Sequence, residues 1–233
     1  MRNEKKLKKK KIIIIRLQGG LGNQMFQYAF SKSLALATNS SLILDLRIYD
    51  IAGIYWTNRE YGLSAFQIDE MVLCEELFSQ LPDSFFFIQE QDDHKLMYAK
   101  ELLESIKYPC YFEGYWQSWK YFHSTESFFH SAFCFKENIL SPEVIEFGKE
   151  ISKTSSVSIH IRRTDYFKYP HLGVLPVAYY YNAIEFIKGK IQKPFFYIFS
   201  DDSDWVDNYF NIPAPFKIVK DFTDVEDLYL MSH

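Results

Sequence analysis

Two adjacent arginines and an aspartate, in the motif Arg162-Arg163-Thr164-Asp165, carry the side chains best suited to bind an anion. They directly follow a run, Val157 to Ile161, in which β-branched residues occupy alternate positions, and this pattern predicts a strand. Ligands of parallel α/β sheets bind beyond the carboxyl ends of the strands, and a guanidinium group matches phosphate oxygens bidentately. The motif therefore predicts an anion site. The alternative for these residues taken alone is a structural Arg–Asp pair that closes a turn.

A glycine-rich turn near the amino terminus has a second arrangement that favours an anion. Ile12 to Leu17 predicts a buried strand, Gln18 to Gln24 contains three glycines, and apolar residues at helical spacing predict a helix from Asn23 to Ala37. Backbone N–H groups at the start of a helix attract negative charge, and glycines allow close approach. The GGxG spacing is neither the full dinucleotide fingerprint nor a P-loop, so an NAD-dependent dehydrogenase rests on this turn alone. A second strand is predicted from Ser41 to Leu46, where Asp45 either binds a hydroxyl group or simply ends the strand.

The segment from Tyr111 to Phe122 is dense in aromatic and polar side chains around one glycine. Aromatic rings stack on the apolar faces of sugars, and carboxylate or amide groups bind sugar hydroxyls. The candidates to bind a sugar are Glu113, Tyr115, Trp116 and Gln117. A packed hydrophobic core explains the same composition equally well.

The last third of the chain repeats a strand–helix–strand layout. A helix is predicted from Ser141 to about Lys153, with Ser as N-cap and Pro at the first helical position, and the polar residues 153–156 predict a domain boundary. Leu175 to Lys190 predicts a further helix, and Pro194 to Phe199 predicts a second buried strand. Two parallel strands joined by a helix place both of their charged ends at one edge of the sheet.

Asp202 and Asp204 form a DxD motif after this second strand. In many nucleotide-sugar transferases such carboxylates hold a divalent metal against a diphosphate, whereas an aspartate before a helix is also a common N-cap. We favour the N-cap interpretation. Asp221 to Ser232 predicts the final helix, so only two strands are predicted for this half of the chain.

The composition is that of a globular protein with one large or two small domains, because 48% of its 233 residues are hydrophobic and 24% are charged. Residues 1–11 hold seven Lys or Arg and one Glu, a net charge of +6, so the overall charge of −4 leaves −10 for the remainder. So acidic a body is a poor fit for nucleic acid, while the tail fits either a solvated segment or peripheral contact with an anionic membrane.

The apolar run Ile12 to Ile15 is too short for a signal peptide or a spanning helix, and three widely spaced cysteines give no disulfide or zinc pattern. We therefore expect a cytoplasmic protein, with the tail as its possible contact to the inner face of the membrane.

Several segments, taken in order, resemble the bacterial α-1,2-fucosyltransferases of glycosyltransferase family 11. They are GGLGNQMFQYAF (residues 19–30), REYGLSAFQI (59–68), FEGYWQSWKYF (112–122), HIRRTDY (160–166), FYIFSDDSDW (196–205) and VEDLYLMSH (225–233). The resemblance implies an α/β, GT-B-like architecture of two Rossmann-like domains. On this basis, residues 1–11 are a basic tail, residues 12–154 an acceptor-side domain and residues 155–233 a GDP-fucose-binding domain. The residues expected to bind the glycan acceptor are Glu113, Tyr115, Trp116 and Gln117.

The activity that the resemblance implies is inverting transfer of L-fucose from GDP-β-L-fucose to the 2-hydroxyl of a galactosyl glycan, without a metal or other cofactor. Arg162 matches the arginine that bonds the β-phosphate and neutralises the departing diphosphate. His160 and Asp227 match positions on the guanine and ribose side of the donor. The full set of expected donor-binding residues, beside Arg162, is His160, Arg163, Asp165, Gly20, Gly22, Asn23, Asp202 and Asp227.

Two departures from the family pattern limit what the resemblance implies. Core-fucosylating relatives carry a catalytic glutamate five residues beyond the motif aspartate, where this chain has Pro170. The general base therefore stays open between Glu113, Asp45 and Asp165, or the hydroxyl loses its proton late, to water or phosphate. Family members also continue past the last helix, so we expect an incomplete donor domain. The alternative to an active enzyme is a non-catalytic fragment that keeps glycan binding.

Overall fold

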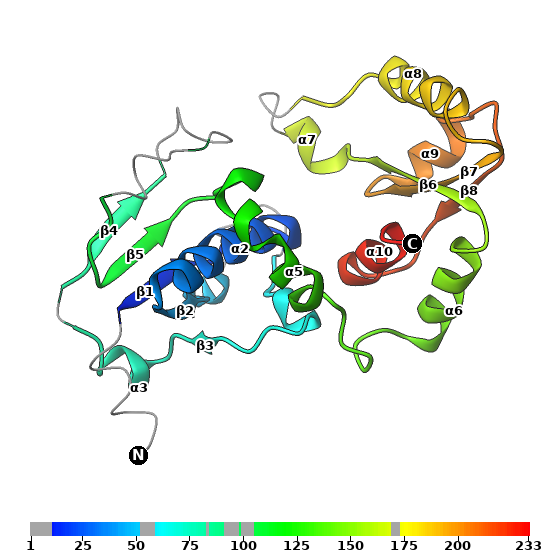
Figure 1. Cartoon of the computed structure of the whole chain (residues 1–233). Helices are drawn as coiled ribbons and strands as arrows, with labels where there is room; N and C mark the ends of the chain where they lie inside the picture. Colours follow the sequence, from blue (N-terminus) through cyan, green and yellow to red (C-terminus); the bar gives the residue numbers. More distant parts are fainter. Residues whose placement is uncertain (1–10, 52–58, 83, 91–97, 99–104, 169–172) are drawn as a thin grey trace. The chain divides into compact units, whose positions relative to one another are not determined.

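The computed structural model describes residues 11–51, 59–82, 84–90, 98, 105–168 and 173–233 (Figure 1). Residues 1–10 of the basic tail lie outside this description, as does the side chain of Asp165. The chain divides into two compact units, residues 1–136 and 137–233. Each unit contains a parallel β-sheet of its own.

The first unit is built on a five-stranded parallel sheet in the order β3-β2-β1-β5-β4. Its strands are β1 (Ile12–Arg16), β2 (Ser41–Asp45), β3 (Met71–Val72), β4 (Phe86–Gln89) and β5 (Cys110–Glu113). β1 is the central strand, and the four isoleucines 12–15 are at most 6% exposed. A continuous apolar run suits a parallel strand that is covered on both faces.

Helix α2 (Leu21–Thr38) joins β1 to β2 and completes the predicted strand–turn–helix–strand unit. It begins at Leu21 rather than at the expected Asn23, with Gly20 in extended conformation as its N-cap. Asn39 ends the helix in the left-handed conformation, with φ 52°. The two strands and the helix predicted for this region are therefore confirmed.

An aromatic core packs between α2 and the segment that follows β5. Phe30 of α2 stacks on Trp116, with ring centroids 4.4 Å apart and planes 10° apart, and meets Phe112 edge-on at 5.1 Å. Trp116 is only 1% exposed, which leaves no ring face for a sugar. The expected acceptor role of Trp116 is corrected accordingly, because its indole belongs to the core.

Short helices complete the unit: η1 (Arg47–Asp50), η2 (Leu63–Ala65), α3 (Glu75–Phe78), η4 (Trp119–Tyr121), η5 (His123–Thr125) and α5 (Glu126–Ala132).

The second unit has a three-stranded parallel sheet in the order β6-β7-β8. Its strands are β6 (Ser155–Ile161), β7 (Pro194–Ser200) and β8 (Phe216–Val219), and only the first two were predicted. The helices are α6 (Pro142–Ile151), α7 (Thr164–Lys168), α8 (Val177–Lys188), α9 (Ser203–Tyr209) and α10 (Asp224–Met231). Across all the residues that the structure describes, no helix combines the length and apolar character needed to cross a bilayer.

Different helices cover the two faces of the second sheet (Figure 1). Phe196 and Ile198 of β7 pack with residues of α8 and α9. Tyr197 and Phe199 pack with residues of α6 and α10. Because successive side chains of a strand point to opposite faces, α8 and α9 cover one face while α6 and α10 cover the other.

Helix α6 belongs to the second unit, so the division of the chain falls before this helix and not after residue 154. Its residues Val144 and Ile151 share a core cluster with Tyr197 and Phe199 of β7. The polar residues 152–154 form the turn from α6 into β6. The polar residues 153–156, which we expected to mark a domain boundary, therefore lie inside the second unit.

Side-chain caps fix the starts of three helices in the second unit. The Ser141 hydroxyl accepts a backbone N–H of α6 at 3.3 Å, as its sequence predicts. The Asp202 carboxylate accepts a backbone N–H of α9 at 3.2 Å, which confirms the N-cap interpretation of the DxD motif. Thr223 and Glu226 form a reciprocal capping box at α10.

Replacing Ile151 with alanine tests the membership of α6 in the second unit. Its side chain is 2% exposed against the second sheet, so the substitution should lower the free energy of unfolding of that unit by about 2 to 5 kcal/mol. Native-state hydrogen exchange should show lost protection in β6 to β8 and retained protection in β1 and β2. Ile43→Ala, at a fully buried position of β2, is the matched control and should give the reverse pattern. Loss of protection confined to the first unit in Ile151→Ala would contradict this division.

Candidate functional site

The carboxyl ends of β6 and β7 bring two charged segments together. The strands pair in parallel with Ile161 opposite Ser200, and the Ser200 hydroxyl donates to the Ile161 carbonyl at 2.8 Å. Arg162 and Arg163 follow the first strand and Asp201 follows the second, so all three lie at the same sheet edge. The prediction that both strand ends meet at one edge is confirmed.

Arg163 is held at this edge by an ion pair and by aromatic rings. Its Nε donates to Asp202 Oδ2 at 3.0 Å, and its guanidinium lies 3.6 Å from the ring centre of Trp205 and 4.9 Å from that of Phe167. The side chain is only 15% exposed. Ion pairing and stacking together restrict a guanidinium in place. Arg163 therefore helps to build the edge, and Asp202 compensates its charge.

Asp201 binds the backbone that follows β6, and sequence reasoning missed it as a site residue. Its Oδ1 accepts from the Arg163 backbone N–H at 2.8 Å, and its Oδ2 accepts from the Thr164 hydroxyl at 2.8 Å. The carboxylate thereby fixes the turn that carries both arginines into α7. The available signal was its position directly after the second predicted strand.

The charge of Arg162 acts on His160 at the same edge. The Arg162 guanidinium lies 5.4 Å from the ring centre of Tyr166. Loss of hydration lowers the pKa of His160, and the Arg162 charge lowers it further, against smaller opposing effects of Asp201 and Asp224. His160 is therefore neutral at pH 7. The residue is nevertheless exposed to solvent.

Asp227 of α10 has an unusual protonation equilibrium. Burial, followed by repulsion from Asp224 and Glu226, raises its pKa from 3.8 to about 6. Asp224 also acts on His160, so the start of α10 lies within electrostatic reach of the end of β6. A carboxyl group with such a pKa donates or accepts hydrogen bonds under mildly acidic conditions.

The two aspartates of the DxD motif are not arranged as a metal site. Asp202 uses one oxygen to cap α9 and the other to bind Arg163. Asp204 is exposed in the first turn of α9. Within the described ranges, no group of three or more His, Cys, Asp or Glu is placed to hold an ion. Metal-free catalysis stays a prediction.

The glycine turn of the first unit is fixed by side-chain contacts. Gly19 has φ +79°, and its carbonyl accepts from the amide of the fully buried Gln24 at 3.1 Å. An added Cβ at Gly19 would lie 2.5 Å from Asn23 Nδ2, so glycine is required there. An added Cβ at Gly20 would lie 3.5 Å from the Arg59 guanidinium. The first N–H groups of α2 give this turn a positive character suited to an anion.

The predicted acceptor residues lie at the carboxyl edge of the first sheet. β1 and β5 are parallel neighbours, and the residues that end them, Arg16 and Glu113, form an ion pair at 2.8 Å. Further along the chain, Gln117 Nε2 donates to Asn23 Oδ1 at 2.6 Å. Tyr115, between these two contacts, is half-buried. The edge therefore combines polar groups of the acceptor segment with the glycine turn.

Asp45 is engaged in structural contacts that weigh against a role as general base. Arg47 binds both of its oxygens, at 2.9 and 2.7 Å, and the Tyr111 hydroxyl donates to Oδ2 at 2.6 Å. Burial raises the pKa of Asp45, but the hydrogen bonds from Arg47 and Tyr111 outweigh burial and lower it overall. A carboxylate stabilised in this way is a weak proton acceptor.

The predicted donor residues fall into two groups. One group belongs to the second unit and comprises His160, Arg162, Arg163, Asp202 and Asp227. The other belongs to the glycine turn of the first unit and comprises Gly20, Gly22 and Asn23. A diphosphate site that uses both groups stays a prediction, and the side chain of Asp165 lies outside the described part of the chain.

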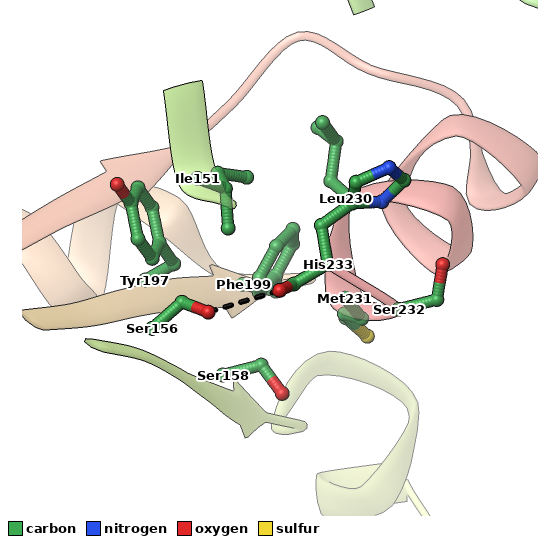
Figure 2. A pocket seen from close by; sticks show the side chains of 9 residues that line it. All are labelled: Ile151, Ser156, Ser158, Tyr197, Phe199, Leu230, Met231, Ser232 and His233. Carbon is green, nitrogen blue, oxygen red and sulfur yellow. Dashed lines mark hydrogen bonds between the residues drawn. The ribbon is translucent and has the colours of Figure 1, made fainter. Parts of the chain in front are cut away.

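A cavity of about 250 Å³ lies on the face of the second sheet next to α10 (Figure 2). Its walls are formed by Ile151, Ser156, Ser158, Tyr197, Phe199, Leu230, Met231, Ser232 and His233. The Ser156 hydroxyl donates to the His233 carbonyl at 3.0 Å. Ser156 and Ser158 lie within the first four residues of β6, whereas Arg162 follows its last residue, about 13 Å further along an extended strand from Ser158. This cavity is therefore separate from the edge that carries the arginines.

The arrangement of parallel sheets matches a solved fucosyltransferase. Crystal structures of NodZ, one from Bradyrhizobium and one soaked with GDP-fucose, align with TM-scores of 0.58 and 0.57 at 15% identity. Each alignment covers 96% of this chain and 82% of the solved chain. The protein thus has the GT-B-like α/β fold of a glycosyltransferase.

The chain belongs to glycosyltransferase family 11, whose model, Glycosyl transferase family 11, matches residues 1–233. An alpha-1,2-colitosyltransferase of Escherichia coli is 31% identical over 240 residues, which cover 95% of this chain and 81% of that protein. The O-antigen biosynthesis glycosyltransferase WbnK of Escherichia coli is 30% identical over 257 residues, which cover 93% of this chain and 82% of that protein. The family expected from the sequence motifs is confirmed.

Asp227→Asn should stabilise the second unit near neutral pH and have little effect in acid. The folded pKa of Asp227, about 6, lies above its ordinary value of 3.8, so the folded state gains stability as the pH falls through this interval. Above it, the partly buried charge costs about 2 kcal/mol after solvent screening, and asparagine removes that cost. Thermal unfolding at about pH 4 and about pH 7.5 measures the difference.

Asp204→Asn is the control for this experiment, because Asp204 is exposed in the first turn of α9. It should shift the melting temperature little at either pH. An equal gain in stability for Asp227→Asn at both pH values would contradict a raised pKa at this position.

Proposed function

We propose that this chain transfers L-fucose from GDP-β-L-fucose to the 2-hydroxyl of a galactosyl glycan, with inversion, to form an α-1,2 linkage. The observation that carries the proposal is the arginine pair at the end of β6 in a chain of glycosyltransferase family 11. The GDP-fucose-soaked NodZ structure, which shares the fold, supports a nucleotide-sugar donor. The Escherichia coli relatives support transfer to a saccharide.

In this proposal Arg162 is the catalytic residue. Its guanidinium bonds the β-phosphate and neutralises the charge that develops on the departing diphosphate, an interaction that strengthens in the transition state. Arg163, held by Asp202 and stacked on Trp205, keeps the strand end in place. The neutral ring of His160 adds no like charge beside Arg162 and serves the guanine and ribose side of the donor.

The acceptor is proposed to bind at the carboxyl edge of the first sheet, through Glu113, Tyr115 and Gln117. Among the carboxylates considered as general base, Asp45 is occupied by Arg47. Glu113 keeps 23% of its side chain exposed beside Arg16, so it is the better supported candidate of the two. Late loss of the proton to water or phosphate is the alternative that needs no base.

A second candidate function is transfer of colitose in place of fucose. The observation that favours it is the 31% identity to the alpha-1,2-colitosyltransferase. Colitose differs from fucose by the absence of the 3-hydroxyl, so one acceptor site and one diphosphate site serve both donors. Parallel assays with GDP-fucose and GDP-colitose at equal concentration decide between them, and the donor with the higher kcat/KM is the preferred substrate.

Arg162→Ala should lower kcat for transfer to lactose or N-acetyllactosamine by about 10² to 10³, because the departing diphosphate loses its charged hydrogen-bond donor. Product formation is followed by measuring the GDP that is formed and, by mass spectrometry, the fucosylated glycan. Lys188→Ala is the matched control, since among the described residues its ion pair is with Glu185 at the surface of α8. Activity that survives Arg162→Ala at the wild-type rate would remove Arg162 from the mechanism.

The transfer assay, combined with calorimetry on the same galactosides, separates an enzyme from a non-catalytic fragment that keeps glycan binding. A wild-type chain that binds the galactoside by calorimetry but transfers neither sugar supports the fragment.

Chelation should leave the transfer rate unchanged. In this proposal Arg162 supplies the positive charge that a divalent cation supplies elsewhere, and both oxygens of Asp202 are already engaged. The initial rate is compared with and without excess EDTA, with added Mg²⁺ or Mn²⁺ as the reciprocal arm. A rate that falls on chelation and returns with either cation would reinstate a metal at the DxD motif.

A further inference from the structure

Glu90, which directly follows β4, has a buried carboxylate that binds the backbone of the predicted acceptor segment. The residue is 8% exposed. Its Oε2 accepts from the Tyr115 backbone N–H at 2.6 Å and from the Trp116 backbone N–H at 3.1 Å, with Oε1 3.2 Å from the latter. The Glu90 backbone N–H donates to the Glu113 carbonyl at 2.8 Å. Hydrogen bonds to an ionised carboxylate are shorter and about twice as strong as those between neutral groups.

The segment that Glu90 binds is a strained turn. Gly114 has φ +153°, and an added Cβ there would lie 2.4 Å from the Glu90 Cβ. Trp116 has φ 54°, in the left-handed region that side chains with a Cβ rarely adopt. Its indole Nε1 is buried and finds no hydrogen-bond partner among the residues that the structure describes. Such unfavourable features persist where the surroundings over-determine the conformation, and they concentrate at functional sites.

Two anchors hold this turn in place. On one side the Trp116 indole is stacked on Phe30 within the core. On the other side the Glu90 carboxylate binds the two successive N–H groups of Tyr115 and Trp116. The indole fixes where the turn sits, and the carboxylate fixes the direction of its backbone.

The residues on either side of the two anchored N–H groups are the polar residues of the acceptor edge. Glu113 precedes the turn and pairs with Arg16 at 2.8 Å. Gln117 follows it and donates to Asn23 Oδ1 at 2.6 Å, at the first turn of α2. A rotation of the turn backbone therefore changes the position of Gln117 relative to Glu113, which the pairing of β4 with β5 holds in the sheet.

We propose that Glu90 is a positioning residue for the glycan acceptor, which it serves by fixing the turn that places Glu113, Tyr115 and Gln117 at the carboxyl edge of the first sheet. The inference rests on the proposed function, because it takes this edge as the acceptor site. Glu90 itself contacts the backbone and not the sugar. Its contribution should therefore appear in acceptor binding and not in donor binding.

Glu90→Gln tests this role, because an amide presents one oxygen and one N–H₂ group to two backbone donors. In either orientation of the amide, its N–H₂ group faces the Trp116 N–H, which both oxygens of the Glu90 carboxylate accept, and the negative charge is lost, so the acceptor KM should rise by about tenfold. The KM for GDP-fucose and the affinity for GDP should stay within about twofold. Kinetics with each substrate varied in turn, with the other saturating, give the two values.

Glu70→Gln is the matched control for a partly buried carboxylate of the same unit. Glu70 is 13% exposed and pairs with Lys32. It should lower the melting temperature without changing the acceptor KM. Gly114→Ala is the second variant, since its Cβ collides with Glu90, and it should reproduce the acceptor KM effect from the opposite side of the contact.

The outcomes separate this inference from the proposed function. Transfer by the wild type with an unchanged acceptor KM in both Glu90→Gln and Gly114→Ala overturns the positioning role and leaves the function standing. Equal losses for donor and acceptor also overturn it, because they indicate a general structural defect. A wild type that binds lactose without transferring sugar, and loses that binding in Glu90→Gln, supports the inference while the proposed function fails. A wild type that neither transfers sugar nor binds a galactoside overturns both.

Discussion

The parallel alignment of neighbouring strands is the constraint on which the rest of this molecule depends. In both sheets every strand pair is parallel, so all strands of a sheet end at the same edge. Arg163 reaches Asp202 only because Ile161 lies opposite Ser200. Arg16 reaches Glu113 by the same logic in the first sheet. A shift of register by one residue would separate these partners and turn the side chains of the strand to the other face.

The contacts of Arg163 at the edge of the second sheet give this arginine a structural role. Asp202 and two aromatic rings restrain Arg163, and Asp201 binds its backbone rather than its guanidinium. Arg162 sits beside a histidine whose pKa is lowered, so the edge gains no second positive charge from that ring at neutral pH. The edge thus combines a cation that builds the structure with a cation whose expected partner is a diphosphate. The two side chains also have different aromatic neighbours, since Arg162 lies over the ring of Tyr166 and Arg163 lies over the rings of Phe167 and Trp205.

Sequence patterns captured the parts of the fold that rest on local chemistry. The isoleucine run of β1, the glycine turn and the Ser-Pro start of α6 carry strong local signals, and each is found where the pattern places it. β8 was missed because Phe216–Val219 is only four residues long and includes an exposed lysine. The division between the units was misplaced because the polar turn after α6 resembles a linker, whereas the packing of α6 on β7 is a tertiary property. Trp116 shows the same limit, since composition alone does not separate a sugar platform from a core ring.

The site residues that sequence reasoning missed share one physical arrangement. Asp201 follows β7 and binds the backbone that follows the neighbouring strand β6. Glu90 follows β4 and binds the backbone that follows the neighbouring strand β5. In each sheet a carboxylate beyond one strand holds the segment beyond the next strand, where the predicted ligand-binding side chains lie. Such a carboxylate forms no motif with those side chains, because the residues come together through strand pairing and not through sequence spacing. These neighbouring carboxylates thus hold the backbone that carries the predicted ligand-binding side chains.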